Sequence, residues 1–393
     1  MGVTAIASRL PLGKPCLRWR RQLTSPLGSL PTALPFRQRW RGHVVKNACS
    51  EHVSDCVRTL PGAGAQAVAH AARELAGLVS SPFDPGLPAQ VDARARELAP
   101  ELGEVFAPPG AAGAAVISGL VLDNADLGPT PQDWSHAGVR SLSADIAMML
   151  LARCAGVPFG WQGQQAGRIV NNVVPAAGHE DEQTGASSAT LLAPHTEDAF
   201  HPRRANMLLL GCMRNPDLVA TTLSSVRQVQ LDEAHRRLLA APTLPILPDI
   251  SYGAVPDTGA APTVSTLWDG PQGPTLRYDP AYTPLPRARA EFRAAYEALT
   301  TELERVSYTV ALEAGQLLLV DNDVAVHGRV PFTARYDGTD RWLKRVNLRL
   351  PQRLRDPAEA AEDGYGQKLV EPYAAAPGRR PSPRPHPALV GAR

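Results

Sequence analysis

The residues best suited to hold a metal ion lie in the stretch PHTEDAFH, residues 194–201. His195 and Glu197 are two positions apart, and in a β-strand this spacing places both side chains on one face. An imidazole and a carboxylate on one face can bind the same ion. His327, in the stretch VHGR, is the best candidate for a third ligand. Two histidines and one carboxylate leave further coordination positions open, which is the ligand set of non-haem Fe(II) sites.

A His-x-Glu pair alone is weak evidence, because it occurs by chance in many chains and a single histidine is more often packed than bound to a metal. Two arginines downstream strengthen the metal interpretation. On a strand, Arg341, Leu343, Arg345 and Asn347 share one face, and Val346 begins the apolar series of the other. Arginines on the inner face of an apolar barrel are costly unless each meets an anion.

Arginine binds carboxylates in a bidentate manner, so the pair predicts two carboxylate-binding points. One carboxylate could belong to a co-substrate and the other to a substrate. The alternative is that both arginines are exposed on an edge strand.

These side chains need a scaffold, and the apolar spacing predicts one that begins with helices and continues with short strands. Helical spacing of apolar residues is found over residues 65–78, 90–102, 141–155, 231–241 and 287–306. Strands are expected at residues 168–174, 189–192, 207–210, 220–226, 308–312, 316–320 and 343–350. Helices followed by many short strands favour a mainly β barrel or sandwich with flanking helices.

The bulk composition agrees with a folded domain that has no polyanionic partner. The chain has 393 residues, of which 44% are hydrophobic, so a sizeable core is possible. Its formal net charge is only +2, which gives no reason to expect a nucleic-acid partner. No apolar run reaches the ~18 residues of a membrane span. The five cysteines form no CxxC pair, and a reducing cytoplasm suits them best.

The two ends of the chain differ from its middle. Residues 1–46 contain seven arginines and no acidic residue. This composition is similar to that of a transit peptide, but we prefer a disordered extension or translated sequence upstream of the true start. We therefore divide the chain into a basic extension (1–58), a catalytic domain (59–357) and a C-terminal segment (358–393) that ends in a Pro/Arg-rich tail.

The ordered motifs resemble the clavaminate synthase-like family of Fe(II)/2-oxoglutarate oxygenases. Within it, the chain is most similar to the hydroxylases of free arginine and asparagine in peptide-antibiotic pathways. The resemblance runs from about residue 62 to residue 357. The matching pieces are GRIVNNVVPAAGHEDEQ (167–183), HTEDAFHP (195–202), NMLLLGCMRNPD (206–217), ATTLSSV (220–226) and VHGRVPFTARYDGTDRWLKRVNLRL (326–350).

The resemblance implies a double-stranded β-helix, or jelly-roll, core, with His195, Glu197 and His327 as iron ligands. It implies that Arg341 binds the distal carboxylate of 2-oxoglutarate, helped by a threonine hydroxyl. Thr222 fits that threonine best, with Thr221 as the second candidate.

It also implies a binding site for an amino acid. Arg345 matches the arginine that holds the α-carboxylate, and Gln164 matches a glutamine that contacts the amino group. Glu197 is expected to approach that group through its outer oxygen. Asp279 matches an acid that covers the far end of the substrate, but Ala281 stands where relatives carry a second acid, and Gly185 where the arginine hydroxylase has a serine. The pocket is therefore expected to favour a side chain with less positive charge than that of arginine.

The expected reaction is hydroxylation of Cβ or Cγ of a free L-amino acid, with Fe(II) as cofactor and 2-oxoglutarate and O2 as co-substrates. Related halogenases replace the carboxylate ligand by a small residue, so the presence of Glu197 favours oxygenation. The alternatives are desaturation or oxidative cyclisation on the same scaffold, or a non-catalytic jelly-roll sensor. The sensor is disfavoured because all three ligands and Arg341 are present.

Overall fold

A computed structural model describes residues 56–253, 261–270 and 273–373. Almost all of the predicted basic extension and most of the predicted Pro/Arg-rich tail lie outside the described residues. No helix within these ranges has the length and apolar character needed to cross a membrane.

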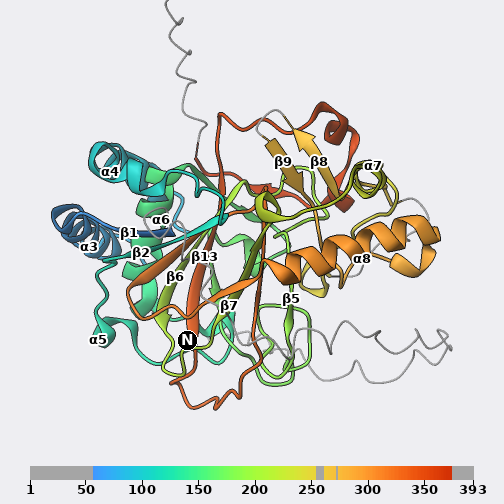
Figure 1. Cartoon of the computed structure of the whole chain (residues 1–393). Coiled ribbons are helices and arrows are strands. Elements are labelled where there is room, and N and C mark those ends of the chain that lie inside the picture. The colour runs from blue at the N-terminus through green and yellow to red at the C-terminus, as the bar shows by residue number, and fades with distance from the viewer. Residues whose placement is uncertain (1–55, 254–260, 271–272, 374–393) are drawn as a thin grey trace, which may run out of the picture. The chain divides into compact units, whose positions relative to one another are not determined.

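Two β-sheets form the centre of the fold and confirm the predicted mainly β jelly-roll architecture with flanking helices (Figure 1). The larger sheet follows the order β1-β2-β11-β6-β13-β3-β14, with β4 also paired to β13. The smaller sheet follows the order β10-β7-β12-β5. The strands of the larger sheet are β1 (Val57–Thr59), β2 (Ala114–Ser118), β3 (Val157–Trp161), β4 (Val170–Val173), β6 (Met207–Arg214), β11 (Gln316–Asp321), β13 (Trp342–Arg349) and β14 (Leu369–Val370). Those of the smaller sheet are β5 (Leu192–His195), β7 (Thr221–Ser225), β10 (Tyr308–Val310) and β12 (Ala325–Arg329).

Alternation of side chains along the central strands builds two cores at once. In β6, Leu208 and Leu210 pack with Leu223 of the smaller sheet, in the core between the two sheets. Met207 and Leu209 point to the opposite face and pack against helices. Both faces of β6 are therefore buried, which explains why its sequence, MLLLGCMR, is a continuous apolar run and does not alternate.

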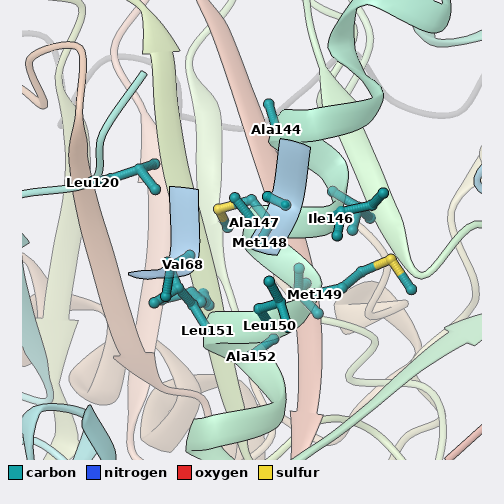
Figure 2. Packing of buried hydrophobic residues seen from close by; sticks show 14 of the residues in the cluster. Val68, Leu120, Ala144, Ile146, Ala147, Met148, Met149, Leu150, Leu151 and Ala152 are labelled. Carbon is teal, nitrogen blue, oxygen red and sulfur yellow. The ribbon is translucent and has the colours of Figure 1, made fainter. Parts of the chain in front are cut away.

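Three helices cover the outer face of the larger sheet: α3 (Gly62–Ala76), α4 (Leu87–Leu102) and α6 (Leu142–Ala155). Helix α6 lies against β13, with α3 and α4 packed on it. Figure 2 shows its apolar residues Ile146 to Ala152 within this core, which also contains Val68 and Leu120. Nearly the whole circumference of α6 is buried, as expected for a helix that is apolar on all sides.

The smaller sheet is covered by a second helical layer. Helices α7 (Glu233–Ala240) and α8 (Ala290–Arg305) pack against each other and share a core with Val326 of β12. A hairpin of β8 (Leu267–Gly270) and β9 (Gly273–Leu276) contributes to the same core, and the short helix α5 (Asn124–Leu127) lies elsewhere, in the connection between β2 and α6.

Most expected elements are present with shifted ends, but one strand is misplaced. Residues 189–191 are not in a strand; the strand begins at Leu192 and ends at His195. The sequence analysis also missed β2, β3, β12 and the β8–β9 hairpin. Each is only four or five residues long, too short for a clear apolar period.

The chain after residue 357 packs back onto the fold as far as Tyr373. Strand β14 pairs with β3, and Tyr373 is buried in the helix-side core. Glu371 accepts two hydrogen bonds of 2.8 Å from Arg203. The Glu371–Arg203 pair attaches the C-terminal segment to the stretch that follows the predicted metal ligands.

Candidate metal and co-substrate site

The two candidate histidine ligands lie side by side on neighbouring strands. His327 of β12 is the register partner of His195 of β5, and their ring centroids are 4.7 Å apart. Gly328 allows this close approach of β12 to β5, because a Cβ at that position would collide with the carbonyl oxygen of Leu192 and lie 3.0 Å from the backbone nitrogen of Pro194. Nδ1 of His195 lies 2.8 Å from the carbonyl oxygen of Ala193. This hydrogen bond holds the proton on Nδ1 and leaves the Nε2 lone pair free to bind a metal.

Glu197 joins the histidines, although the strand ends before it. Its Oε2 atom lies 3.3 Å from Nε2 of His327 and 3.9 Å from Nε2 of His195. Its backbone N–H donates to Oδ1 of Asn322 at 2.8 Å, and Nδ2 of Asn322 donates back to the Glu197 carbonyl. His195 and Glu197 lie close together, as expected. However, the two hydrogen bonds with Asn322 position Glu197, and the alternation of a strand does not.

Neighbouring side chains stabilise the ionised form of Glu197. Burial alone would raise the pKa of this carboxyl, but the guanidinium of Arg345, in contact with its Oε1, and the two imidazoles lower that pKa to about 2. Oε2 accepts no hydrogen bond from the described residues. Burial lowers the pKa of His195, which keeps its ring neutral.

One carboxylate oxygen and two imidazole nitrogens therefore meet at one point, all within 4.8 Å of one another. This donor set fits Fe(II), because it combines two imidazoles with one ionised carboxylate and leaves coordination positions for other ligands. Elsewhere in the described ranges, no other group of three such side chains converges in this way.

Arg341 extends into the same cavity just before β13 begins. Arg341 is 7% exposed. Within the described residues it makes one hydrogen bond, from Nη2 to Thr221 Oγ1 at 3.3 Å. No described carboxylate pairs with it, and burial lowers its pKa to about 10. A buried guanidinium without a counter-charge is costly, so this position suits an anionic ligand.

The threonine beside Arg341 is Thr221, the second candidate of the sequence analysis. Thr221 lines the cavity, whereas strand alternation puts Thr222 on the other face of β7, against Gly328. The hydroxyl of Thr222 is buried without a described partner. The geometry thus favours Thr221 over Thr222 as the residue that could assist Arg341.

The side chains of Arg345 and Gln164 are in contact, as expected if both bind the backbone of one amino acid. Nη2 of Arg345 donates to Gln164 Oε1 at 2.8 Å and to Asn171 Oδ1 at 3.3 Å. Arg341, Leu343 and Arg345 all line the cavity, so the predicted face of this segment is correct. Val346 and Leu348 pack in the helix-side core, as predicted for the other face.

The cavity has a volume of about 460 Å³ and is lined by both cationic and acidic side chains. Arg329, Arg341 and Arg345 lie among its lining residues, near the metal ligands. Three carboxylates also line it and come from loops: Asp133, Glu182 and Asp249. None of the three was expected from the sequence, because isolated acids in loops give no periodic signal.

Asp279 is placed differently from the expectation. Its Oδ1 atom accepts hydrogen bonds from the backbone N–H groups of Ala281 and Tyr282, so it caps a turn. It is not among the described residues that line the cavity, whereas Gly185 is. Burial raises the pKa of Asp279 to about 6. Contact with a substrate stays a prediction for Asp279, and Asp249 is better placed for it.

Arg329 is another residue that the sequence analysis missed. It lies two positions after His327 and is 3% exposed. Its guanidinium donates to the carbonyl oxygens of Ser187 and Thr190, at 2.6 and 3.2 Å. It thereby ties the loop before β5 to the strand that carries His327. Burial lowers its pKa to about 9, and the charge of Arg341 acts in the same direction.

Comparison with known proteins adds independent information. Residues 156–347 match the family described as taurine catabolism dioxygenase TauD, TfdA family. The chain is 38% identical over 261 residues to an enduracididine beta-hydroxylase of Streptomyces hygroscopicus, covering 60% of this chain and 76% of the relative. It is 35% identical over 260 residues to an L-ornithine/L-arginine 3-hydroxylase of Catenulispora acidiphila, covering 59% and 75%.

Solved structures agree with the sequence relatives. The non-heme iron oxygenase OrfP in complex with Fe, succinate and (3S)-hydroxy-L-Arg superposes with a TM-score of 0.67 at 35% identity, covering 74% of this chain and 93% of that one. Asparagine oxygenase in complex with Fe(II), 2S,3S-3-hydroxyasparagine and succinate superposes with a TM-score of 0.65 at 30% identity, with the same coverage.

Proposed function

The chain belongs to the TauD/TfdA family of dioxygenases, and from this premise we propose that it hydroxylates Cβ or Cγ of a free L-amino acid with a basic side chain. It is a non-haem iron enzyme that uses 2-oxoglutarate. The observation that carries the proposal is the cavity in which Arg345 lies beside Glu197, with acidic residues elsewhere in the wall.

His195, Glu197 and His327 would hold Fe(II). With 2-oxoglutarate and O2, the bound iron supplies the oxidising power that inserts one oxygen atom into a C–H bond, while 2-oxoglutarate is converted to succinate and CO2. The chain itself orients the ligands. The bond from His195 to the Ala193 carbonyl and the Asn322 clamp on Glu197 fix the two donors before iron arrives. An ionised carboxylate in the ligand set favours oxygenation over halogenation.

Arg341 and Thr221 would bind the distal carboxylate of 2-oxoglutarate. Arg341 is buried and has no described carboxylate partner, so the incoming anion would supply its missing counter-charge. Arg329 adds a second buried positive charge to the same end of the cavity. Two cations at that end suit the negatively charged distal carboxylate of the co-substrate.

Arg345 and Gln164 would hold the backbone of the amino acid. Arg345 would bind the α-carboxylate, while Gln164 and the outer oxygen of Glu197 would accept from the ammonium group. An amino acid bound to a carrier protein is a thioester and has no α-carboxylate, so Arg345 favours a free substrate. Two anchors on one backbone fix which carbon faces the metal ligands.

The acidic residues of the wall would bind the far end of the substrate. Asp133, Glu182 and Asp249 are well suited to a positively charged side chain. The relatives named above include enzymes for enduracididine and for ornithine or arginine, which have such side chains. An ornithine- or lysine-like amine fits the proposal as well as a guanidine does, because either group would bring one positive charge to these carboxylates.

The test is a screen of free L-amino acids with Fe(II), ascorbate and 2-oxoglutarate. Succinate release together with a mass gain of one oxygen atom on a basic amino acid is the expected result. A loss of two hydrogens without added oxygen would instead indicate desaturation or ring closure. If only neutral or acidic amino acids react, the proposed role of the acidic residues is wrong.

A competition experiment separates free from carrier-bound substrate. The best amino acid is offered together with the same residue loaded on a carrier protein, to the wild type and to Arg345→Ala. Preference for the free form, lost in the variant, is expected. Arg335→Ala is the matched control, since this exposed arginine pairs with Asp217. Preference for the carrier-bound form would refute the assignment of Arg345.

A further inference from the structure

Next to the metal site, the carboxyl group of Asp198 accepts hydrogen bonds from three separate elements of the fold. Oδ2 accepts hydrogen bonds from Trp161 Nε1 at 2.6 Å and from Asn347 Nδ2 at 3.2 Å. Oδ1 accepts from the hydroxyl of Tyr252 at 2.6 Å. Asp198 is 7% exposed and has a φ of 52°, a left-handed conformation that Asp and Asn tolerate better than most residues.

Each donor lies close in sequence to a residue of the amino-acid site. Trp161 is three residues before Gln164, whose backbone N–H donates to the Trp161 carbonyl at 3.1 Å. Asn347 is two residues after Arg345 on β13. Asp198 itself follows Glu197 directly.

Tyr252 connects this carboxylate to the wall of the cavity. It ends the short turn Ile250–Tyr252, which Asp249 caps through a 2.7 Å bond to the Ser251 N–H. Asp249, Ile250 and Ser251 all line the cavity. The side chain of Tyr252 is buried, and its ring centroid lies 4.9 Å from that of Phe200. The hydrogen bond from its hydroxyl to Asp198 therefore holds the turn in place from the protein interior.

We propose that Asp198 is the positioning residue that holds Gln164, Arg345 and the Asp249 turn in one rigid frame around the amino acid. The inference rests on the proposed function and deepens it. A single carboxylate with three donors from three separate elements makes their positions interdependent. Of the three donors, only Tyr252 belongs to the Asp249 turn. Loss of its hydrogen bond would therefore displace this turn and weaken substrate binding, while the metal ligands stay in place.

The test compares Tyr252→Phe, Asp198→Asn and the control Tyr373→Phe. Tyr252→Phe deletes one donor. Asp198→Asn keeps the shape and tolerates the left-handed backbone, but its amide cannot accept all three bonds. Tyr373 is also a buried tyrosine, but it lies in the helix-side core and its hydroxyl has no described partner. KM and kcat are measured for the amino acid and for 2-oxoglutarate with saturating Fe(II), together with the 2-oxoglutarate consumed per product formed.

For Tyr252→Phe we expect KM for the amino acid to rise by up to about tenfold, which corresponds to the loss of one buried hydrogen bond. KM for 2-oxoglutarate should be unchanged, and more 2-oxoglutarate should be consumed per product. Asp198→Asn should show a larger rise, and Tyr373→Phe none. Equal changes in both KM values, or a lowered melting temperature with both KM values unchanged, would overturn the proposal.

Hydrogen exchange keeps this test separate from the proposed function. Without any substrate, Tyr252→Phe should accelerate amide exchange in residues 249–253, and Asp198→Asn should accelerate it there and in residues 161–167. Tyr373→Phe should accelerate neither. If amide exchange in both segments is unchanged in Tyr252→Phe and Asp198→Asn, the proposed role of Asp198 is wrong. If the wild type oxidises no amino acid while exchange responds as expected, the proposed substrate is wrong and the frame is retained.

Discussion

Replacing Arg341 by methionine should separate co-substrate binding from folding. Methionine keeps much of the length of the side chain but removes the charge. Arg341 has one hydrogen bond of 3.3 Å and no described carboxylate partner, so the free protein loses little when the guanidinium is removed. The complex with 2-oxoglutarate loses a buried ion pair, and breaking such a pair costs about 3–5 kcal/mol. At about 1.4 kcal/mol for each factor of ten, the affinity should fall by about 10²- to 10⁴-fold.

Two assays measure these effects independently. Succinate release as a function of 2-oxoglutarate concentration gives KM, and thermal unfolding without oxygen gives the stabilisation that 2-oxoglutarate confers. The wild type should be stabilised by about 2.7 kcal/mol at a concentration of about 100 times Kd, and Arg341→Met hardly at all. The melting temperature without ligand should not fall in the variant. Arg335→Met serves as an exposed control. An unchanged KM for 2-oxoglutarate in Arg341→Met would show that another residue holds the co-substrate.

Three further predictions concern the metal ligands, the N-terminal extension and His201. His195→Ala, Glu197→Ala and His327→Ala should each abolish turnover and reduce the iron retained after dialysis; near wild-type activity and iron content in His327→Ala would contradict the ligand set. Deletion of residues 1–46 should leave activity and melting temperature largely intact, and a soluble but inactive truncation would oppose the proposed domain division. Burial lowers the pKa of His201 to about 4, below its ordinary 6.5, so the folded state resists protonation of this ring while the unfolded state does not. Its contribution to stability, about 3 kcal/mol at most, is present above pH 6.5 and is lost as the pH falls towards 4; thermal unfolding across that range should show a smaller loss in His201→Asn, and equal slopes would contradict this.

The chemistry of the site could be predicted further from the sequence than its architecture. The side chains of His195, Glu197 and His327 do converge, and Arg341 does lie in their cavity. The reason given for Glu197 was incomplete, because β5 ends at His195 and Asn322 positions the carboxylate from a distant turn. A clamp between residues 125 positions apart leaves no local pattern in the sequence.

The choice between Thr221 and Thr222 illustrates a second limit. Adjacent residues of a strand point to opposite faces, so a register error of one residue exchanges the inward and outward side chains. The sequence alone did not fix the start of β7, whereas the structure pairs Thr221 with Arg329 on the cavity side. Loop residues such as Asp249 could not be found for a related reason, since their positions depend on tertiary contacts such as the bond from Tyr252 to Asp198.

The central claim is that this cavity hydroxylates a free basic amino acid. The most direct measurement incubates the full chain with Fe(II), 2-oxoglutarate, isotopically heavy O2 and ornithine, lysine or arginine, followed by mass spectrometry of the amino acid and of succinate. The account predicts one heavy oxygen atom in the amino acid at Cβ or Cγ and one in succinate, in equal amounts. Succinate formed without any oxidised amino acid, across basic and neutral amino acids alike, would contradict it.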